Sequence, residues 1–182
     1  MASKGEGVQE QFYFAVSLSE LKQSGRKRVI LENGRVIAVF YVKDEVYALD
    51  HFCYHTGGPL DMGDIEDSHG RLCVVCPWHK HSITLDTGES LYTSIDPFNI
   101  RNVKHNCSKG VKQRVHHVRI HEDKVLVQMS DLSQPLDSDR YFTEEYKDLI
   151  EGVLKEPILQ PNRRTVTVPI HSTRTGLPPS KR

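Results

Sequence analysis

The sequence has little of what would place it in a membrane or on a nucleic acid. Its longest uninterrupted apolar run is the seven residues from Val36 to Val42, whereas a membrane-spanning helix needs about 20. Its 24 basic and 24 acidic residues cancel, so the chain lacks the basic excess typical of nucleic-acid binding. The first ten residues lack the apolar stretch of a signal peptide. We therefore expect a cytoplasmic monomer that binds neither membranes nor nucleic acid.

Cysteine is also scarce. The chain of 182 residues contains four, namely Cys53, Cys73, Cys76 and Cys107. In a reducing cytoplasm, cysteines at this frequency are typical of metal ligands or buried thiols rather than of a disulfide framework.

Charge and proline divide the chain into zones. Residues 1–129 contain 16 acids and 16 bases, residues 130–156 contain eight acids and three bases, and residues 157–182 contain five bases, no acid and five of the nine prolines. A chain of this length suits one domain with appended segments. We predict a flexible N-terminus over 1–10, one folded domain over 11–130, an acidic segment with an accessory helix over 131–156, and a mostly disordered basic tail over 157–182.

The predicted domain consists of short strands. Asn33-Gly34 between Arg28–Glu32 and Arg35–Val42 predicts a hairpin with a type I′ turn. Ser17 and Glu20 predict a capped helical turn. Strands at this spacing, with no long helical period, favour an all-β antiparallel sandwich or barrel. The other predicted strands are Phe12–Val16, Val46–Leu49, Leu72–Val75, Ser82–Leu85, Leu91–Thr93, Val115–Ile120 and Lys124–Met129.

The acidic segment carries the clearest helical pattern. Its apolar residues recur at i, i+3, i+4, i+7 and i+8, with Thr143 as a candidate N-cap and Pro157 ending the helix. These residues are Tyr146, Leu149, Ile150, Val153 and Leu154. We predict an accessory helix packed on the body, with a partner-binding helix as the alternative. Thr165–Val168 could add one strand in the tail.

Two short segments carry the residue types that bind metals. The first is Cys53-Tyr54-His55-Thr56-Gly57-Gly58-Pro59-Leu60, and the second is Cys76-Pro77-Trp78-His79, with 20 residues between His55 and Cys76. Each provides one thiolate and one imidazole from a loop that follows a predicted strand. The glycines and prolines suit a tight backbone around a buried inorganic group.

The mixed pairing distinguishes two kinds of metal site. A structural zinc site usually takes two cysteines from one side and two histidines from the other. Two loops that each provide one Cys and one His favour a binuclear cluster with two different irons, as in Rieske [2Fe–2S] centres. Cys53, His55, Cys76 and His79 are therefore the candidate ligands of one [2Fe–2S] cluster.

These motifs, with Thr87-Gly88-Glu89 after them, resemble the two cluster loops and the following turn of Rieske domains. Val46-Tyr47-Ala48-Leu49-Asp50 is similar to the family's approach to the first loop. The resemblance runs from about Phe12 to Met129 and is strongest to the free-standing soluble type, the Rieske-type ferredoxins and the animal Rieske domain-containing proteins. It implies a Rieske-type β-sandwich with a small cluster-binding subdomain and a C-terminal helix in addition.

The resemblance also implies a role for each ligand. Cys53 and Cys76 would bind the inner iron, and His55 and His79 would bind the outer, more exposed iron. Respiratory Rieske subunits add a disulfide that clamps the two loops, but Gly58 and Trp78 occupy those places here.

Two further departures concern the residues after His79. His81 and Ile83 stand where respiratory relatives have Ser and Tyr hydroxyls near the cluster sulfurs. Fewer hydrogen bonds to sulfur stabilise the reduced cluster less, so we expect a low potential. Lys80 replaces the glycine of many ferredoxin-type loops, and the redox partner therefore cannot be inferred from bacterial relatives.

Other cysteines and histidines are interpreted as structural. Cys73 lies within a predicted strand and is assigned to the core, and Cys107 lies in a polar loop over Asn102–Lys112. Val118 and Ile120 are predicted to face the core together with His116, which argues against a second metal site around His121-Glu122-Asp123. Five other histidines are interpreted as surface residues: His51, His69, His81, His105 and His171.

The sequence therefore predicts an electron-transfer protein with one low-potential Rieske cluster and a redox partner protein, a reductase or an acceptor. The chain is not expected to be an enzyme by itself. One alternative is the Rieske component of a multi-chain oxygenase or reductase. A further alternative is a zinc-bound structural module that uses the same four ligands.

Overall fold

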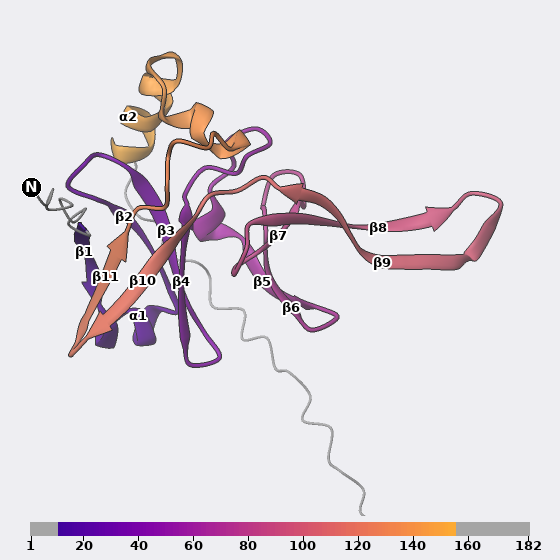
Figure 1. Ribbon diagram of the computed structural model, residues 1–182, viewed down its shortest axis with the longest axis horizontal. Coiled ribbons are helices and arrows are strands. Elements are labelled where there is room, and N and C mark those ends of the chain that lie inside the picture. The colour runs from indigo at the N-terminus through magenta and orange to yellow at the C-terminus, as the bar shows by residue number, and fades with distance from the viewer. Residues whose placement is uncertain (1–10, 156–182) are drawn as a thin grey trace, which may run out of the picture.

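The computed structural model describes residues 11–155, which form two antiparallel sheets, shown side by side in Figure 1. The six-stranded sheet has the order β1 (Phe12–Ser17), β11 (Lys124–Gln128), β10 (Val115–His121), β4 (Glu45–Asp50), β3 (Val36–Val42) and β2 (Arg26–Ile30). The five-stranded sheet has the order β5 (Asp64–Ser68), β6 (Arg71–Val75), β7 (Ser82–Thr84), β8 (Glu89–Asp96) and β9 (Asn99–Val111).

Helices are few, as expected for this class. They are α1 (Leu18–Ser24), α2 (Lys147–Lys155) and the short 3₁₀ helices η1 (Leu60–Met62), η2 (Asp137–Phe142) and η3 (Glu144–Tyr146). Within the described residues, none of the helices is long and apolar enough to cross a membrane. The predicted all-β antiparallel fold with a C-terminal helix is confirmed. The predictions for residues 1–10, Pro157, Thr165–Val168 and the tail lie outside the described residues.

Strand β3 explains the longest apolar run in the sequence, because both of its faces are buried. Ala38 and Phe40 pack toward the second sheet, in a cluster with Val74 of β6 and Ile83 of β7. The alternate residues of β3, Ile37 and Val39, pack in a second cluster, which α1 joins through the fully buried Leu21. The first of these two hydrophobic cores also contains Cys53 and Cys76, so it lies beneath the two loops that carry the predicted metal ligands.

The structure has a turn at Asn33-Gly34, as predicted, but the prediction of a type I′ turn is wrong. A type I′ turn needs positive φ at both central residues, and only Gly34 has it, at +83°. The amide of Leu31 donates instead to the Arg35 carbonyl at 2.9 Å, closing a three-residue loop, and the Asn33 carboxamide accepts from the Arg35 amide. Lys43 and Asp44, with φ of 50° and 65°, form the turn with two positive φ angles, between β3 and β4.

Two features of the second sheet were not predicted from the sequence: strand β5 and the length of the hairpin formed by β8 and β9. Strand β5 is an acidic edge strand, Asp64–Ser68, without apolar alternation. Strands β8 and β9 form a long hairpin that projects from the body in Figure 1, whereas Leu91–Thr93 and a polar loop were expected. The side chains of β9 are almost all exposed, so the hairpin is stabilised by strand pairing and leaves little hydrophobic periodicity to detect.

The caps of the helices follow the sequence in part. Ser17 caps α1 by accepting a hydrogen bond from the Glu20 amide at 3.2 Å, and Gly25 ends the helix at φ +75°. The Glu20 carboxylate pairs with Lys27 instead of completing a capping box. In the acidic segment, the Thr143 hydroxyl donates to the Arg140 carbonyl rather than capping α2.

The segment after β11 is attached to the body by a buried polar network. Asp50, at the end of β4, accepts hydrogen bonds from Arg35 at 2.7 Å and from the Ser138 hydroxyl at 2.8 Å, and it pairs with His116 at 3.1 Å. Asp139 pairs with Arg35 and with Arg114. Burial alone would raise the pKa of Asp139, but hydrogen bonds from Arg114, the Leu136 amide and Arg35 lower that pKa to about 2. The carboxylate therefore stays charged at any physiological pH.

We predict that Asp139→Asn lowers the free energy of unfolding by about 3 kcal/mol, because it leaves a buried Arg114 without its carboxylate. The matched control is Asp137→Asn, two residues away, which removes only an exposed pair with Lys112 and should cost less than about 1 kcal/mol. Urea denaturation of both variants at neutral pH measures the difference. Equal losses in the two variants would contradict the assignment of the network as an anchor.

Candidate metal centre

The four predicted ligands lie in two loops that are closed by the same pair of backbone hydrogen bonds. The first loop follows β4 and the second follows β6, so the two loops come from different sheets. In the first loop the Gly57 amide donates to the Cys53 carbonyl at 2.9 Å, and in the second the Lys80 amide donates to the Cys76 carbonyl at 3.0 Å. Each cysteine amide is in turn bonded to the carbonyl five residues on, in Gly58 and His81 respectively.

This equivalence explains the unusual backbone at Lys80. Gly57 and Lys80, each four residues after a cysteine, have positive φ of 78° and 56°. Glycine adopts this region without strain, whereas a side chain makes it less favourable. Lys80 therefore occupies a position where the loop geometry favours glycine, and its side chain is exposed.

The loops bring the ligands together in two pairs of different exposure. The side chains of Cys53 and Cys76 are buried, with 0% and 1% of their surface exposed. His55 and His79 are exposed, and their rings meet edge to face with centroids 4.9 Å apart. The two thiols thus lie inside the protein, and the two imidazoles lie at its surface.

The two thiols share a hydrogen bond, and their surroundings favour negative charge on Cys76 rather than on Cys53. The interaction between the two thiols and their burial raise the pKa of Cys53 far above its usual value. A hydrogen bond from Cys53 and the backbone amides of Trp78 and His79 together lower the pKa of Cys76 to about 6 despite its burial. The backbone amide of His55 makes the equivalent hydrogen bond to the Cys53 sulfur. Amides directed at sulfur are what a buried thiolate ligand requires.

The donor set fits a Rieske [2Fe–2S] cluster. Two thiolates on the inner side and two imidazoles on the outer side match a centre in which His₂ replaces Cys₂ on one iron. Gly58 supports the same interpretation, because a Cβ atom added there would lie 2.7 Å from the Cys76 sulfur and 3.3 Å from the Trp78 ring. Gly58 and Trp78 are therefore neighbours, as expected from the resemblance, which puts the disulfide of respiratory Rieske subunits at these two positions. In the part of the chain that the structure describes, no group of three or more His, Cys, Asp or Glu residues surrounds a single ion position.

His81 and Ile83 lie close to this site. The His81 ring is 4.4 Å from that of His55, and its Nδ1 is 3.0 Å from the Tyr54 hydroxyl, which also contacts Ser90 at 2.7 Å. Ile83 is completely buried in the core that contains both cysteines. The Tyr54 hydroxyl is thus bonded to Ser90 and His81.

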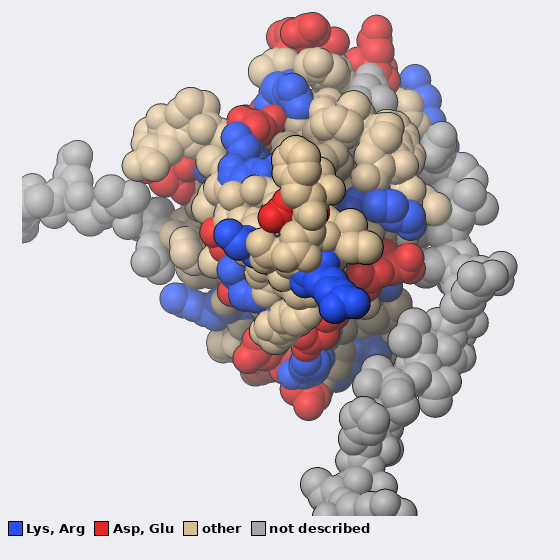
Figure 2. Space-filling model, turned by 90° about the vertical axis from the view of Figure 1, so that its right-hand side faces the viewer, with Lys and Arg blue, Asp and Glu red and all other residues tan. Residues whose placement is uncertain are grey.

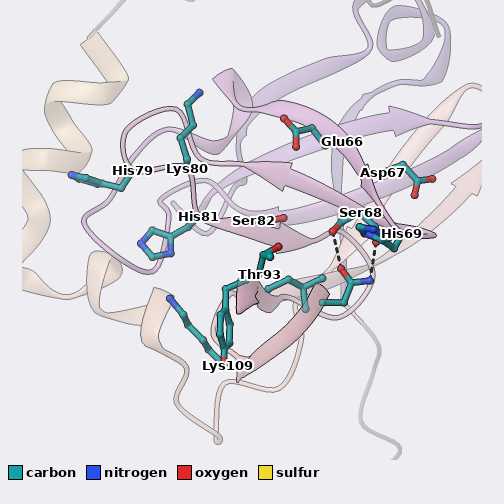
Figure 3. A pocket seen from close by; sticks show the side chains of 13 residues that line it. Glu66, Asp67, Ser68, His69, His79, Lys80, His81, Ser82, Thr93 and Lys109 are labelled. Atoms are coloured by element: carbon teal, nitrogen blue, oxygen red, sulfur yellow. Dashed lines mark hydrogen bonds between the residues drawn. The ribbon is translucent and has the colours of Figure 1, made fainter. Parts of the chain in front are cut away.

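A hollow of about 580 Å³ opens beside His79, between the second loop and the long hairpin. Figure 3 shows His79, Lys80 and His81 at one end of it and Thr93 and Lys109 from the hairpin below them. Glu66 and Asp67 of β5 line the other side (Figure 3). The exposed imidazole therefore stands at the rim of a polar hollow.

The residues interpreted as structural divide into three outcomes. Cys73 is fully buried in β6, as predicted, whereas Cys107 lies in strand β9 rather than in a loop. His51 is completely buried and not a surface residue, and burial lowers its pKa to about 3. Ile120 is 46% exposed and not in the core, because β10 extends past the second sheet toward its turn, while His116 is buried against Asp50.

Two residues of the site were missed. The buried side chain of Gln113 accepts a hydrogen bond from the Tyr54 amide at 2.9 Å and donates to the carbonyls of Asp50 and Phe52 at 3.0 Å each. These bonds hold the backbone from Asp50 to Tyr54, where the chain enters the first ligand loop. Arg140 of η2 donates to the carbonyls of Tyr54 and His55. Both are far from the loop in sequence and stand in polar stretches, so no local pattern identifies them.

A β-sandwich with two equivalent Cys/His loops, thiols inside and imidazoles outside, has the architecture of a Rieske domain. The family model of the soluble Rieske-type ferredoxins matches residues 16–132, more than half of the chain. The chain belongs to this family.

Known proteins agree with the assignment. The chain is 46% identical over 128 residues to a human Rieske domain-containing protein, covering 70% of this chain and 81% of that one. It is 30% identical over 106 residues to a ferredoxin component of a naphthalene 1,2-dioxygenase system from Pseudomonas aeruginosa, covering 58% and 93%. A nitrite reductase small subunit from Mycobacterium tuberculosis shares the fold, with a TM-score of 0.51, 22% identity and coverage of 67% and 97%.

We predict that Gly58→Ala lowers both the cluster content and the free energy of unfolding, the latter by about 1–3 kcal/mol. The added methyl group would collide with the Cys76 sulfur and the Trp78 ring. Gly152→Ala in α2 is the control, since its Cβ would meet nothing within 4 Å, and alanine favours helix. Iron content and thermal unfolding measure both effects. Full iron content in the Gly58 variant would show that the two loops are not tightly apposed.

Proposed function

We propose that the protein is a one-electron carrier whose Rieske [2Fe–2S] cluster is bound by Cys53 and Cys76 at the inner iron and by His55 and His79 at the outer iron. The observation that carries this proposal is the separation of the ligands into a buried thiol pair and an exposed imidazole pair. Membership of the soluble Rieske-type ferredoxin family supports the same cofactor. A bound cluster of this type supplies reversible one-electron chemistry.

The residues of the chain have separate tasks in this function. The core around Cys53 and Cys76 excludes water from the thiolates, and the amides of His55, Trp78 and His79 stabilise their charge. The rings of His55 and His79 are exposed to solvent, so a docked redox partner would be separated from the metal site by a short electron-transfer distance. Backbone hydrogen bonds close each loop onto its own cysteine and restrain the ligands, so we expect little movement of the ligands when the charge of the cluster changes.

A redox partner protein is part of the proposal. Relatives are named as ferredoxin components of dioxygenase systems, which supports a reductase or an oxygenase as the partner class. A Rieske component of a multi-chain enzyme is compatible with the same observation. Figure 2 views the molecule from the side to which the hairpin projects, and there basic and acidic side chains are interspersed. Docking on that side would therefore depend on shape and polar contacts more than on charge of one sign.

We further propose that the protein acts in the cytoplasm as a monomer. The four cysteines are free thiols, which suits a reducing compartment. Light scattering of the purified protein tests the oligomeric state, and a dimer mass at micromolar concentration would contradict this part of the proposal.

The cluster is tested by counting iron and sulfide and by recording absorption and EPR spectra of protein purified without oxygen. We expect two irons and two sulfides per chain, and their loss in Cys53→Ser and Cys76→Ser. Cys73→Ser is the matched control, because this cysteine is equally buried three residues before Cys76 but lies within strand β6 and not in a ligand loop. A colourless protein with one zinc would replace the electron carrier with a structural zinc module.

We predict a reduction potential near the lower end of the Rieske range of about −150 to +300 mV. The physical reason is that the Tyr54 hydroxyl is bonded to Ser90 and His81, and that Ile83 is aliphatic, so these residues do not stabilise the extra electron through hydrogen bonds to sulfur. Voltammetry at neutral pH measures the midpoint. A reversible midpoint above about +100 mV would contradict the prediction.

A further inference from the structure

Arg140 joins the segment after the matched family region to the first ligand loop. Its guanidinium donates to the Tyr54 carbonyl and, at 2.7 Å, to the His55 carbonyl. These two residues lie between Cys53 and Gly57, inside the loop that carries two of the four ligands. The family match ends at residue 132, so this contact comes from a part of the chain beyond the shared domain.

The backbone on both sides of Arg140 is firmly held. Ser138 is buried, its hydroxyl donates to Asp50 at 2.8 Å and accepts from the Arg114 amide at 3.0 Å. Tyr141 is 3% exposed and packs against Phe52, the residue before Cys53, with ring centroids 6.1 Å apart. The two buried anchors restrict the positions that the Arg140 side chain can reach, although Arg140 itself is exposed.

The charge of Arg140 differs from that of its basic neighbours. Arg35 is paired with Asp50 and Asp139, and Arg114 with Asp139. Within residues 11–155, no carboxylate forms an ion pair with Arg140, whose hydrogen-bond acceptors are the two loop carbonyls. Its charge also interacts with the Cys53 sulfur.

We propose that Arg140 is a positioning residue of the cluster site, which fixes the His55 loop and adds a positive charge that raises the reduction potential. The inference rests on the proposed electron-transfer function. Reduction adds one negative charge to the centre, and a fixed cation nearby stabilises the reduced form more than the oxidised form. Solvent screens part of this effect because the guanidinium is not fully buried.

The test compares three variants of the full-length protein containing the cluster. Arg140→Gln removes the charge, and Arg140→Lys keeps the charge but replaces the planar guanidinium with a compact ammonium on a different stem. Arg101→Gln removes the same charge from the exposed hairpin strand β9, which projects away from the body (Figure 1). Voltammetry measures the potential, EPR reports the outer iron's ligand geometry, and iron and sulfide are counted for every sample.

We expect Arg140→Gln to shift the one-electron equilibrium toward the oxidised form by up to about tenfold, which corresponds to a fall of about 59 mV. Arg140→Lys should keep most of the wild-type potential with an altered EPR signal, and Arg101→Gln should change neither. Loss of the cluster from the Gln variant alone also supports the proposal, because the Lys variant then shows that the charge is required.

Three outcomes would overturn the inference. The potential and EPR signal of Arg140→Gln could equal those of the wild type, or the Lys variant could fall as far as the Gln variant. Loss of the cluster from both Arg140 variants would make the contact structural and not electrostatic. Failure of the proposed function is distinguished from these results by the wild-type protein itself, which would then contain no iron and sulfide.

Discussion

The arrangement of the site depends on one buried carboxylate, that of Asp50. It ends strand β4 immediately before the first ligand loop and is completely buried. Burial would raise its pKa, but His116 and Arg35 lower it, so the charge is retained inside the protein. A charge buried at this depth is tolerated only with several partners. The partners of Asp50 come from β10, from the turn before β3 and from η2, and they therefore fix three separate segments around the start of the loop.

The two ligand loops solve the same local problem with different residues. Each closes on its own cysteine through an amide four residues on, with positive φ at Gly57 in one and at Lys80 in the other. Since the loops close in the same way, the two cysteines occupy equivalent positions and both are buried. The histidines do not, because His55 is two residues after its cysteine and His79 is three residues after its own, yet both rings are exposed. The core beneath the loops buries the thiols and leaves the imidazoles at the surface.

The chemistry of the site could be predicted from the sequence, because Cys53, His55, Cys76 and His79 carry it in two local motifs whose spacing is unusual. The strands of the body were also predictable, since their burial produces alternation or, in β3, a continuous apolar run. Strands β5 and β9 and the full length of β8, of which only Leu91–Thr93 was predicted, were not, because edge and projecting strands leave too little buried surface to impose a pattern. Gln113 and Arg140 act through contacts that span 59 to 86 residues, and no periodicity encodes such distances. The burial of His51 has the same origin.

The long hairpin has a consequence for how the molecule behaves at high concentration. Strand β9 is one of the two edge strands of its sheet and is 13 residues long, and an edge of this length can pair with the edge of another molecule. Arg101, Lys104 and Lys109 lie along it, and three register shifts interrupt its pairing with β8. Charged side chains and bulges both oppose edge-to-edge addition. The hairpin can therefore extend into solvent without making the protein a template for fibre growth.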